Sequence, residues 1–271
     1  MQFIYPSPKG RPVPIEISHK PRWTELTLNQ PPRNVLDGEM LTALVATLDE
    51  LAGGKAPLLM IKANGKHFST GYSIKDIPEE VFHHDPEVRK GAPFEQLMYR
   101  VASYPAPILA KVQGDAYGGA VEMLACCDIR VAAEGIRLGV PSVRLGLVYS
   151  HTGLRRMIRT FGSPLVREML LTGEPITADR AYKEGFFNRL VTSNELEETA
   201  TQLMESMANG PPLALRGTRR LLNLLEDSES LPDGTLNEIA ELRHRSWSGE
   251  EFEKARDAFI NKKPSPFDRE K

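Results

Sequence analysis

Two glycine-containing stretches of the chain are suited to binding a negatively charged oxygen. They read NGKHFSTGYSI at residues 64–74 and QGDAYGGAVEM at residues 113–123, and each follows a short apolar run. Glycine permits close backbone approach and unusual dihedral angles. The start of a helix carries amide groups without intrahelical acceptors and a partial positive charge. Two such amides aimed at one point would form an oxyanion hole, which stabilises negative charge as it develops on a substrate oxygen.

Four side chains near these stretches are candidates for the chemistry itself. Glu122 falls near the first turn of a predicted helix, where it either reaches into a pocket as an acid–base group or has a structural role, as a helix cap or in an internal salt bridge. Tyr149 and His151 stand in the segment LGLVYSHTGL, and His151 is also placed to cap a helix that begins near Thr152. Tyr72 lies near the end of the first stretch and either lines a pocket or packs as a buried aromatic ring.

The apolar pattern predicts the elements that must position these groups. The segment TELTLNQ alternates in the manner of a strand, and residues 37–54 have helical spacing with Asp37 as the N-cap and a glycine pair at the end. APLLMIKANG, APILAKVQG and CDIRVAAE are continuous apolar runs that predict strands buried on both faces. Strands that alternate with helices in this way predict an α/β fold with parallel strands and helical crossovers.

Helical patterns dominate after about residue 150. The clearest are PLVREMLLTG, TADRAYKEG, ELEETATQLMESMANG, PLALRGTRRLLNLLED and EEFEKARDAFINKK. We therefore expect an α/β core over residues 1–200, which carries the site, and a helical C-terminal region over residues 201–271.

Composition narrows the class of protein. Of 271 residues, 41% are hydrophobic and 26% are charged, and the net charge of -2 gives no general attraction to nucleic acid or anionic membranes. Basic pairs such as Arg155-Arg156 are expected to be solvated surface. The only two cysteines, Cys126 and Cys127, are adjacent, which suits neither a disulfide nor a metal site. With no secretory signal and no transmembrane run, we expect a cytoplasmic protein without a metal.

Several motifs, in order and at matching spacing, resemble the crotonase (enoyl-CoA hydratase/isomerase) superfamily. They are NVLDGEM, HFSTGYSIKDI, VQGDAYGGAVEMLACCDIRVAAE, LGVPSVRLGLV, LTGEPITADRAYKEGFFNRLV and AFINKKPSPF. The resemblance implies a ββα superhelix core with a helical C-terminal trimerisation region, and assembly as a homotrimer or hexamer. It also implies an acyl thioester substrate, carried by coenzyme A or by acyl-carrier protein, and no cofactor other than that coenzyme A.

The same resemblance assigns roles to residues. The backbone amides of Tyr72 and Gly119 would hold the thioester oxygen and stabilise an enolate-like anion, with Glu122 and Tyr149 as the other catalytic residues. Substrate-binding roles fall on Asn34, Val35, His67, Ser69, Gly71, Gly118, Ser142, His151, Phe259 and Lys262.

The segment from Pro141 to Tyr149 bears on the reaction. Hydratases of this family resemble one another in a second glutamate that follows a proline, whereas this chain has Ser142 there, and serine has no titratable proton near neutral pH. The tyrosine at Tyr149 resembles the methylmalonyl-CoA decarboxylases of the family, although these have a histidine where this chain has Tyr72. That resemblance implies decarboxylation, with the Tyr149 hydroxyl orienting the departing carboxylate.

Two other functions remain open from the sequence. Glu122 as the single acid–base group would suit an isomerase, a hydratase or a dehydratase acting on enoyl or hydroxyacyl thioesters. A non-catalytic acyl-CoA-binding homologue is the alternative from a different class, and the retained glycines and Glu122 weigh against it.

Overall fold

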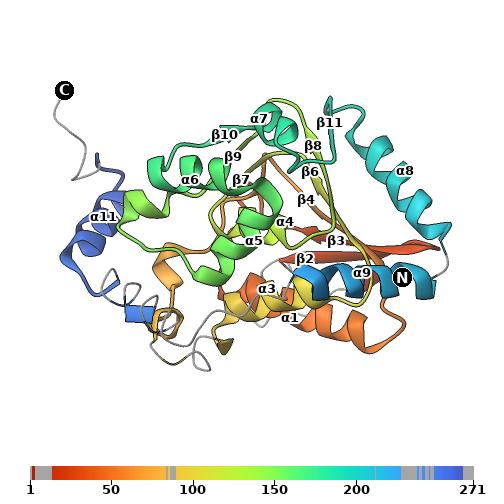
Figure 1. Cartoon of the computed structure of the whole chain (residues 1–271), viewed down its shortest axis with the longest axis horizontal. Helices are drawn as coiled ribbons and strands as arrows, with labels where there is room; N and C mark the ends of the chain where they lie inside the picture. Colours follow the sequence, from red (N-terminus) through yellow and green to blue (C-terminus); the bar gives the residue numbers. More distant parts are fainter. Residues whose placement is uncertain are drawn as a thin grey trace.

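The fold was analysed in a computed structural model of the chain. The structure describes residues 2–3, 14–83, 85, 90–210, 212–226, 237, 240–241, 244 and 247–264. Its main sheet has seven strands in the order β1-β2-β3-β4-β6-β8-β11 (Figure 1). The strands are β1 (Gln2–Phe3), β2 (Ile15–His19), β3 (Trp23–Leu28), β4 (Leu58–Ala63), β6 (Ile108–Val112), β8 (Ile129–Ala133) and β11 (Arg189–Val191).

The pairing of these strands confirms the predicted α/β fold. Strands β3, β4, β6, β8 and β11 are parallel to one another, while β2 pairs antiparallel with both β1 and β3. The apolar runs of β4, β6 and β8 are buried almost throughout, as expected for parallel strands covered on both faces.

A second, four-stranded sheet was not predicted from the sequence. Its order is β10-β9-β7-β5, with β5 (His67–Ser69), β7 (Asp115–Tyr117), β9 (Arg137–Gly139) and β10 (Ile176–Thr177). Each of β4, β6 and β8 in the main sheet is followed along the chain by a short strand of this sheet and then by helical structure. This is the ββα repeat of the expected superhelix. Because β5 pairs in parallel with β7, the segments that leave these two strands emerge side by side.

Helices occupy the predicted segments and cover the sheets (Figure 1). Asp37 caps the first helix by accepting a hydrogen bond from the Met40 amide, as the sequence predicts. The predicted boundary at residue 200 falls inside α8, and the division into two regions remains a prediction. The helices are α1 (Gly38–Gly53), α3 (Pro93–Ser103), α4 (Gly119–Ala125), α5 (His151–Phe161), α6 (Ser163–Thr172), α7 (Ala178–Lys183), α8 (Leu196–Ala208), α9 (Pro212–Glu226) and α11 (Glu250–Ile260), with short 3-10 turns η1 (Ile74–Asp76), η2 (Glu79–Phe82) and η3 (Pro141–Leu145).

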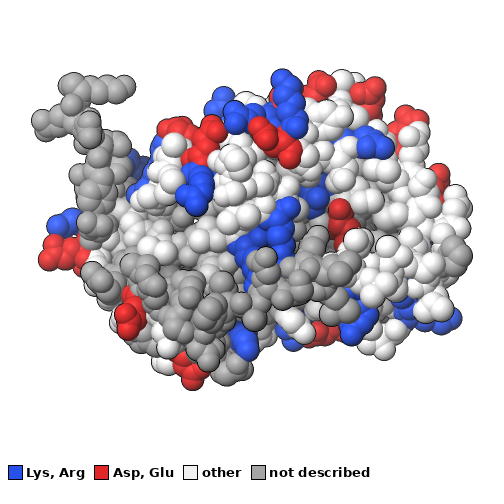
Figure 2. Space-filling view, viewed as in Figure 1, with Lys and Arg blue, Asp and Glu red and all other residues white. Residues whose placement is uncertain are grey.

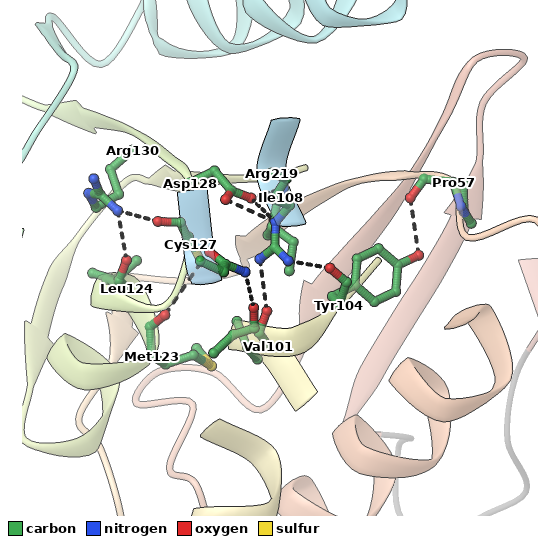
Figure 3. Close-up of polar contacts among 12 residues, drawn as sticks. Pro57, Val101, Tyr104, Ile108, Met123, Leu124, Cys127, Asp128, Arg130 and Arg219 are labelled. Carbon is green, nitrogen blue, oxygen red and sulfur yellow. Dashed lines mark hydrogen bonds and ion pairs between the residues drawn. The ribbon is translucent and has the colours of Figure 1, made fainter. Parts of the chain in front are cut away.

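A buried arginine ties α9 to the core (Figure 3). The Arg219 side chain is 5% exposed, and its Nε donates to the Asp128 carboxylate at 2.7 and 2.9 Å. Its terminal nitrogens donate to the backbone oxygens of Val101 and Tyr104 at the end of α3. Asp128 in turn accepts from the Ile108 amide at 2.6 Å. Since a buried charge is costly unless it is paired, this network fixes α9 against the strands β6 and β8.

The surface and the cysteines agree with an ordinary globular chain. Lys and Arg are interspersed with Asp and Glu over the face shown in Figure 2. Cys126 and Cys127 are buried and unbridged, and burial raises the pKa of the Cys126 thiol to about 12. None of the helices in the described part of the chain is long and apolar enough to cross a membrane.

Candidate active site

A cavity of about 470 Å³ opens where the strands of the second sheet end. Its wall is largely apolar and includes Phe94 and Val140, with a few polar groups among them. The polar and glycine residues in the wall are Arg33, His67, Thr70, Tyr72, Glu95, Tyr117, Gly118, Gly119, Glu122, Ser142, Tyr149 and Ser150. An apolar cleft with a few convergent polar groups is typical of a site for a small molecule.

The two glycine-containing segments meet closely at one end of this cavity. Gly71 has a φ of +82°, and a Cβ built on it would lie 2.3 Å from the Tyr117 oxygen and 2.9 Å from the Gly119 nitrogen. Real Cβ atoms do not approach other atoms so closely, so only glycine fits at this position. The contact brings the segment that carries Tyr72 against the start of α4.

The amides of Tyr72 and Gly119 are placed at this contact. Leu36 donates to the Gly71 oxygen at 2.9 Å, and the Ser73 amide donates to the Leu36 oxygen at 3.3 Å. Leu36 and Tyr72 thus form a parallel bridge, in which Leu36 bonds to the residues on either side of Tyr72. The amide of Tyr72 itself therefore points away from Leu36. Gly119 begins α4, so its amide has no acceptor within the helix, and both residues line the cavity.

Glu122 is completely buried in the wall of the cavity. Its Oε2 accepts a hydrogen bond from the Tyr149 hydroxyl at 2.8 Å, and its Oε1 accepts one from Nη1 of Arg156 at 2.5 Å. Burial raises the pKa of the Glu122 carboxyl, while the Arg156 guanidinium opposes that rise. The internal salt bridge expected as one alternative for Glu122 is present, with Arg156 as its partner, and the side chain also lines the cavity. A helix cap does not describe the side chain, because its partners come from another part of the chain.

Tyr149 stands in the wall with its hydroxyl on Glu122. Burial, followed by the nearby Glu122 carboxylate, raises the pKa of Tyr149 well above that of free tyrosine, so the phenol keeps its proton. The neighbouring helix leaves room for this pair at Gly153, where a Cβ would lie 2.5 Å from Cε1 of Tyr149 and 2.6 Å from Oε2 of Glu122. A glycine inside α5 is therefore part of the architecture of the site.

Tyr72 contributes a ring as well as an amide. Its ring stacks on that of Phe94, with centroids 5.1 Å apart and planes inclined by 14°. Both predictions for Tyr72 are therefore confirmed, because its ring packs on Phe94 and the residue lines the cavity.

Several predicted substrate-binding residues also lie in the wall. His67, Gly118, Ser142 and Phe259 line the cavity, and Phe259 is 50% exposed. Nδ1 of His67 is buried and has no hydrogen-bond partner among the described residues.

Other predicted residues support the wall from outside. Asn34 is fully buried, and its Nδ2 donates to the backbone oxygens of Asn64 and His67 at 2.8 and 3.0 Å. Ser69 donates to the Asn34 oxygen at 2.6 Å and accepts from the Gly71 amide at 3.1 Å. These two side chains therefore fix the loop that carries Tyr72. Among the described residues, Val35, Gly71, His151 and Lys262 also lie outside the set that lines the cavity, and their contact with substrate remains a prediction.

Two residues of the site were missed in the sequence. Glu95 lines the cavity, and its Oε2 lies 3.6 Å from Nη1 of Arg156. The expectation that Arg155-Arg156 is solvated surface is wrong for Arg156, whose side chain is only 19% exposed and reaches Glu122. The helical spacing of α5 could have indicated this position, because Arg156 lies one turn after Thr152 and Gly153, on the same face of the helix. No cluster of three His, Cys, Asp or Glu side chains suited to a metal occurs in the described part of the chain.

Comparison with known proteins agrees with this geometry. The family model for enoyl-CoA hydratase/isomerase matches residues 23–270. The chain is 27% identical over 236 residues to methylmalonyl-CoA decarboxylase of Escherichia coli K12, which covers 86% of this chain and 89% of that protein. It is 33% identical over 208 residues to 2,3-dehydroadipyl-CoA hydratase of the same organism, covering 76% and 80%.

A solved structure shows the same fold. Methylmalonyl-CoA decarboxylase complexed with 2S-carboxypropyl-CoA superposes with a TM-score of 0.87 at 24% identity, over 95% of this chain and 98% of that one. The match over nearly the whole chain, together with the sequence similarity, decides the family. The chain belongs to the enoyl-CoA hydratase/isomerase family, also called the crotonase family.

Proposed function

We propose that this crotonase-family enzyme is a lyase that decarboxylates an acyl-CoA thioester with a carboxylate on the carbon next to the thioester carbonyl. The observation that carries the proposal is the composition of the cavity wall. It holds a protonated Tyr149 hydroxyl beside Glu122, and Ser142 where a second catalytic glutamate would stand in a hydratase. The similarity to methylmalonyl-CoA decarboxylase over 86% of the chain supports the same reading.

The reaction requires stabilisation of one developing negative charge. The bond between the α-carbon and the carboxylate breaks, carbon dioxide leaves, and the electron pair forms the enolate of the thioester. The amides of Tyr72 and Gly119 would hold the enolate oxygen, and the loss of one such donor typically costs about 2.7–4 kcal/mol of transition-state stabilisation. The apolar wall favours the loss of charge from the carboxylate. Protonation of the α-carbon then completes the reaction.

Tyr149 is the group that would orient the departing carboxylate. Its hydroxyl has one proton, which it donates to Glu122 at 2.8 Å. The carboxylate of a bound substrate would compete with Glu122 for the hydrogen bond from Tyr149. When the substrate carboxylate receives this hydrogen bond, Tyr149 holds it in position. No separate cofactor is required, because the thioester carbonyl itself accepts the electron pair.

A second candidate reaction has its own supporting observation. Glu95 joins Glu122 in the wall, so the cavity contains two carboxylates although the expected second glutamate is serine. A pair of carboxylates suits hydration or dehydration of an enoyl or hydroxyacyl thioester, whereas Glu122 alone suits isomerisation. The 33% identity to 2,3-dehydroadipyl-CoA hydratase supports this alternative.

A substrate screen with two variants separates these reactions. Malonyl-, methylmalonyl-, enoyl- and 3-hydroxyacyl-CoA are incubated with the enzyme, and products are identified by mass. Decarboxylation predicts carbon dioxide from the first two thioesters and a loss of roughly 10- to 100-fold in Tyr149→Phe, the worth of one charge-assisted hydrogen bond, with a smaller loss in Glu122→Gln. The reverse ranking with enoyl or hydroxyacyl thioesters supports the alternative. Saturable binding of CoA without any turnover would leave only a non-catalytic binding protein.

Carrier and assembly complete the proposal. We propose coenzyme A rather than acyl-carrier protein, following the substrates named for the relatives. We also propose a homotrimer or hexamer, as the family implies. The exposed leucines of α9 support assembly, since Leu213 is 85%, Leu221 is 62% and Leu222 is 55% exposed.

A further inference from the structure

Arg156 lies behind the wall of the cavity, between two carboxylates. Its Nη1 is 2.5 Å from Oε1 of Glu122 and 3.6 Å from Oε2 of Glu95. The three residues come from three helices, α5, α4 and α3 respectively. Both glutamates line the cavity, whereas Arg156 does not. A cation in this position influences a substrate through the two acidic groups that it contacts.

Glu95 is held in place from its other side. Thr152 donates from its hydroxyl towards the two carboxylate oxygens at 3.3 and 3.2 Å. Glu95 also stands in the first turn of α3, where the helix dipole favours a negative charge. Thr152 precedes Arg156 by one helical turn, so a single face of α5 supplies both partners of Glu95. The guanidinium is therefore shared between two acidic groups that are both fixed.

We propose that Arg156 is a positioning residue that holds Glu122 against the Tyr149 hydroxyl, and that Glu95 tunes this hold by sharing the guanidinium. Arg156 occupies Oε1 of Glu122 and leaves Oε2 directed at the tyrosine. The Tyr149 hydroxyl then donates its hydrogen bond to Glu122 until a substrate carboxylate competes for that hydrogen bond. This inference deepens the proposed function, and it relies on that function only for the role of Tyr149.

The arrangement makes opposite predictions for the two partners of Glu122. The groups that act on its charge are Arg156 from α5, the Tyr149 hydroxyl just before α5, and Glu95 from α3. The Cys126 thiol at the end of α4 is neutral, because burial raises its pKa to about 12. Removal of the cation must make Glu122 hold its proton more tightly, whereas removal of the Glu95 charge must make it hold the proton less tightly. A residue with only a packing role would not produce shifts of opposite sign.

The test is a titration of Glu122 in the unliganded protein. Carboxyl groups of glutamate are labelled with ¹³C, and the Glu122 signal is assigned by its absence in Glu122→Gln. Arg156→Met is expected to raise the titration midpoint by about one pH unit or more, and Glu95→Gln to lower it. Arg159→Met is the matched control, because Arg159 lies on the exposed side of the same helix and the same charge is lost. Its midpoint should equal that of the wild type.

The outcomes separate this inference from the proposed reaction. Shifts in the same direction for Arg156→Met and Glu95→Gln, or no shift in either, would overturn the inference. If Arg156→Met does not fold, the sign of the Glu95→Gln shift decides alone. In turnover, Arg156→Met should lower kcat and leave KM nearly unchanged, since Arg156 does not line the cavity. A wild-type protein that releases no carbon dioxide would refute the proposed function, while the titration would still decide the inference.

Discussion

Gly153 provides a test in which helix propensity and the geometry of the site predict opposite results. Alanine is preferred over glycine inside a helix by roughly 0.5–1 kcal/mol, so Gly153→Ala should stabilise α5 if nothing else changes. In this structure the added Cβ would lie 2.5 Å from Cε1 of Tyr149 and 2.6 Å from Oε2 of Glu122. Ordinary carbon contacts are about 3.5–4.0 Å, so the tyrosine ring must move by about 1 Å or more.

That displacement sets the expected magnitude. Overpacking of a buried site costs about 1–3 kcal/mol, which exceeds the gain in propensity. The 2.8 Å hydrogen bond between Tyr149 and Glu122 would lengthen beyond the usual range for such bonds. We expect the free energy of unfolding to fall by about 1 kcal/mol after the gain in propensity is subtracted, and kcat to fall at least about tenfold.

Urea unfolding measures the change in the free energy of unfolding. Steady-state turnover of the thioester that the wild type consumes measures the change in kcat. Gly217→Ala in α9 is the matched control, since a Cβ there meets nothing within 4 Å. This control should gain stability and keep full activity. If Gly153→Ala gains as much stability as Gly217→Ala and keeps its kcat, the packing of Tyr149 on Glu122 is not as described.

Two further predictions concern buried charges. Burial raises the pKa of Glu122, so the folded protein binds that proton more tightly than the unfolded chain does. The stability of the wild type relative to Glu122→Gln should therefore fall as pH rises from the ordinary glutamate pKa through the raised folded value. Urea unfolding at several pH values checks this, and a difference independent of pH would contradict it. Arg219→Met should lower the free energy of unfolding by about 2–3 kcal/mol. This loss is at or below the usual cost of breaking a buried ion pair, because the Asp128 side chain that is left behind is 27% exposed to water. The exposed Arg220→Met is the control, and an equal loss in both variants would refute the role of the Arg219 network.

The main sheet was predictable because its signals are local. The runs of β4, β6 and β8 are apolar over consecutive residues, and Asp37 marks the start of α1 by its type and position. The second sheet was missed because strands such as β5 have only three residues and no alternation to detect. Its parallel register, rather than any sequence pattern, brings the segment of Tyr72 beside Gly119.

The site was predictable only where a motif carried it. Glu122 and Tyr149 were identified separately, and both line the cavity. Their contact depends on how α5 packs on α4, which no local pattern specifies. Arg156 was taken for surface because an arginine pair in a helix is usually solvated, and Glu95 was not considered. Long-range packing of three helices converts these charged residues into one buried network.

The central claim is that the amides of Tyr72 and Gly119 receive one thioester oxygen. The most direct measurement is a crystal structure of this protein with a non-hydrolysable acyl-CoA analogue in the cavity. The account predicts that both amide nitrogens lie about 2.7–3.1 Å from the carbonyl oxygen, with the acyl group directed at Tyr149 and Glu122. A carbonyl oxygen bound elsewhere, with the two amides directed at other acceptors, would contradict it.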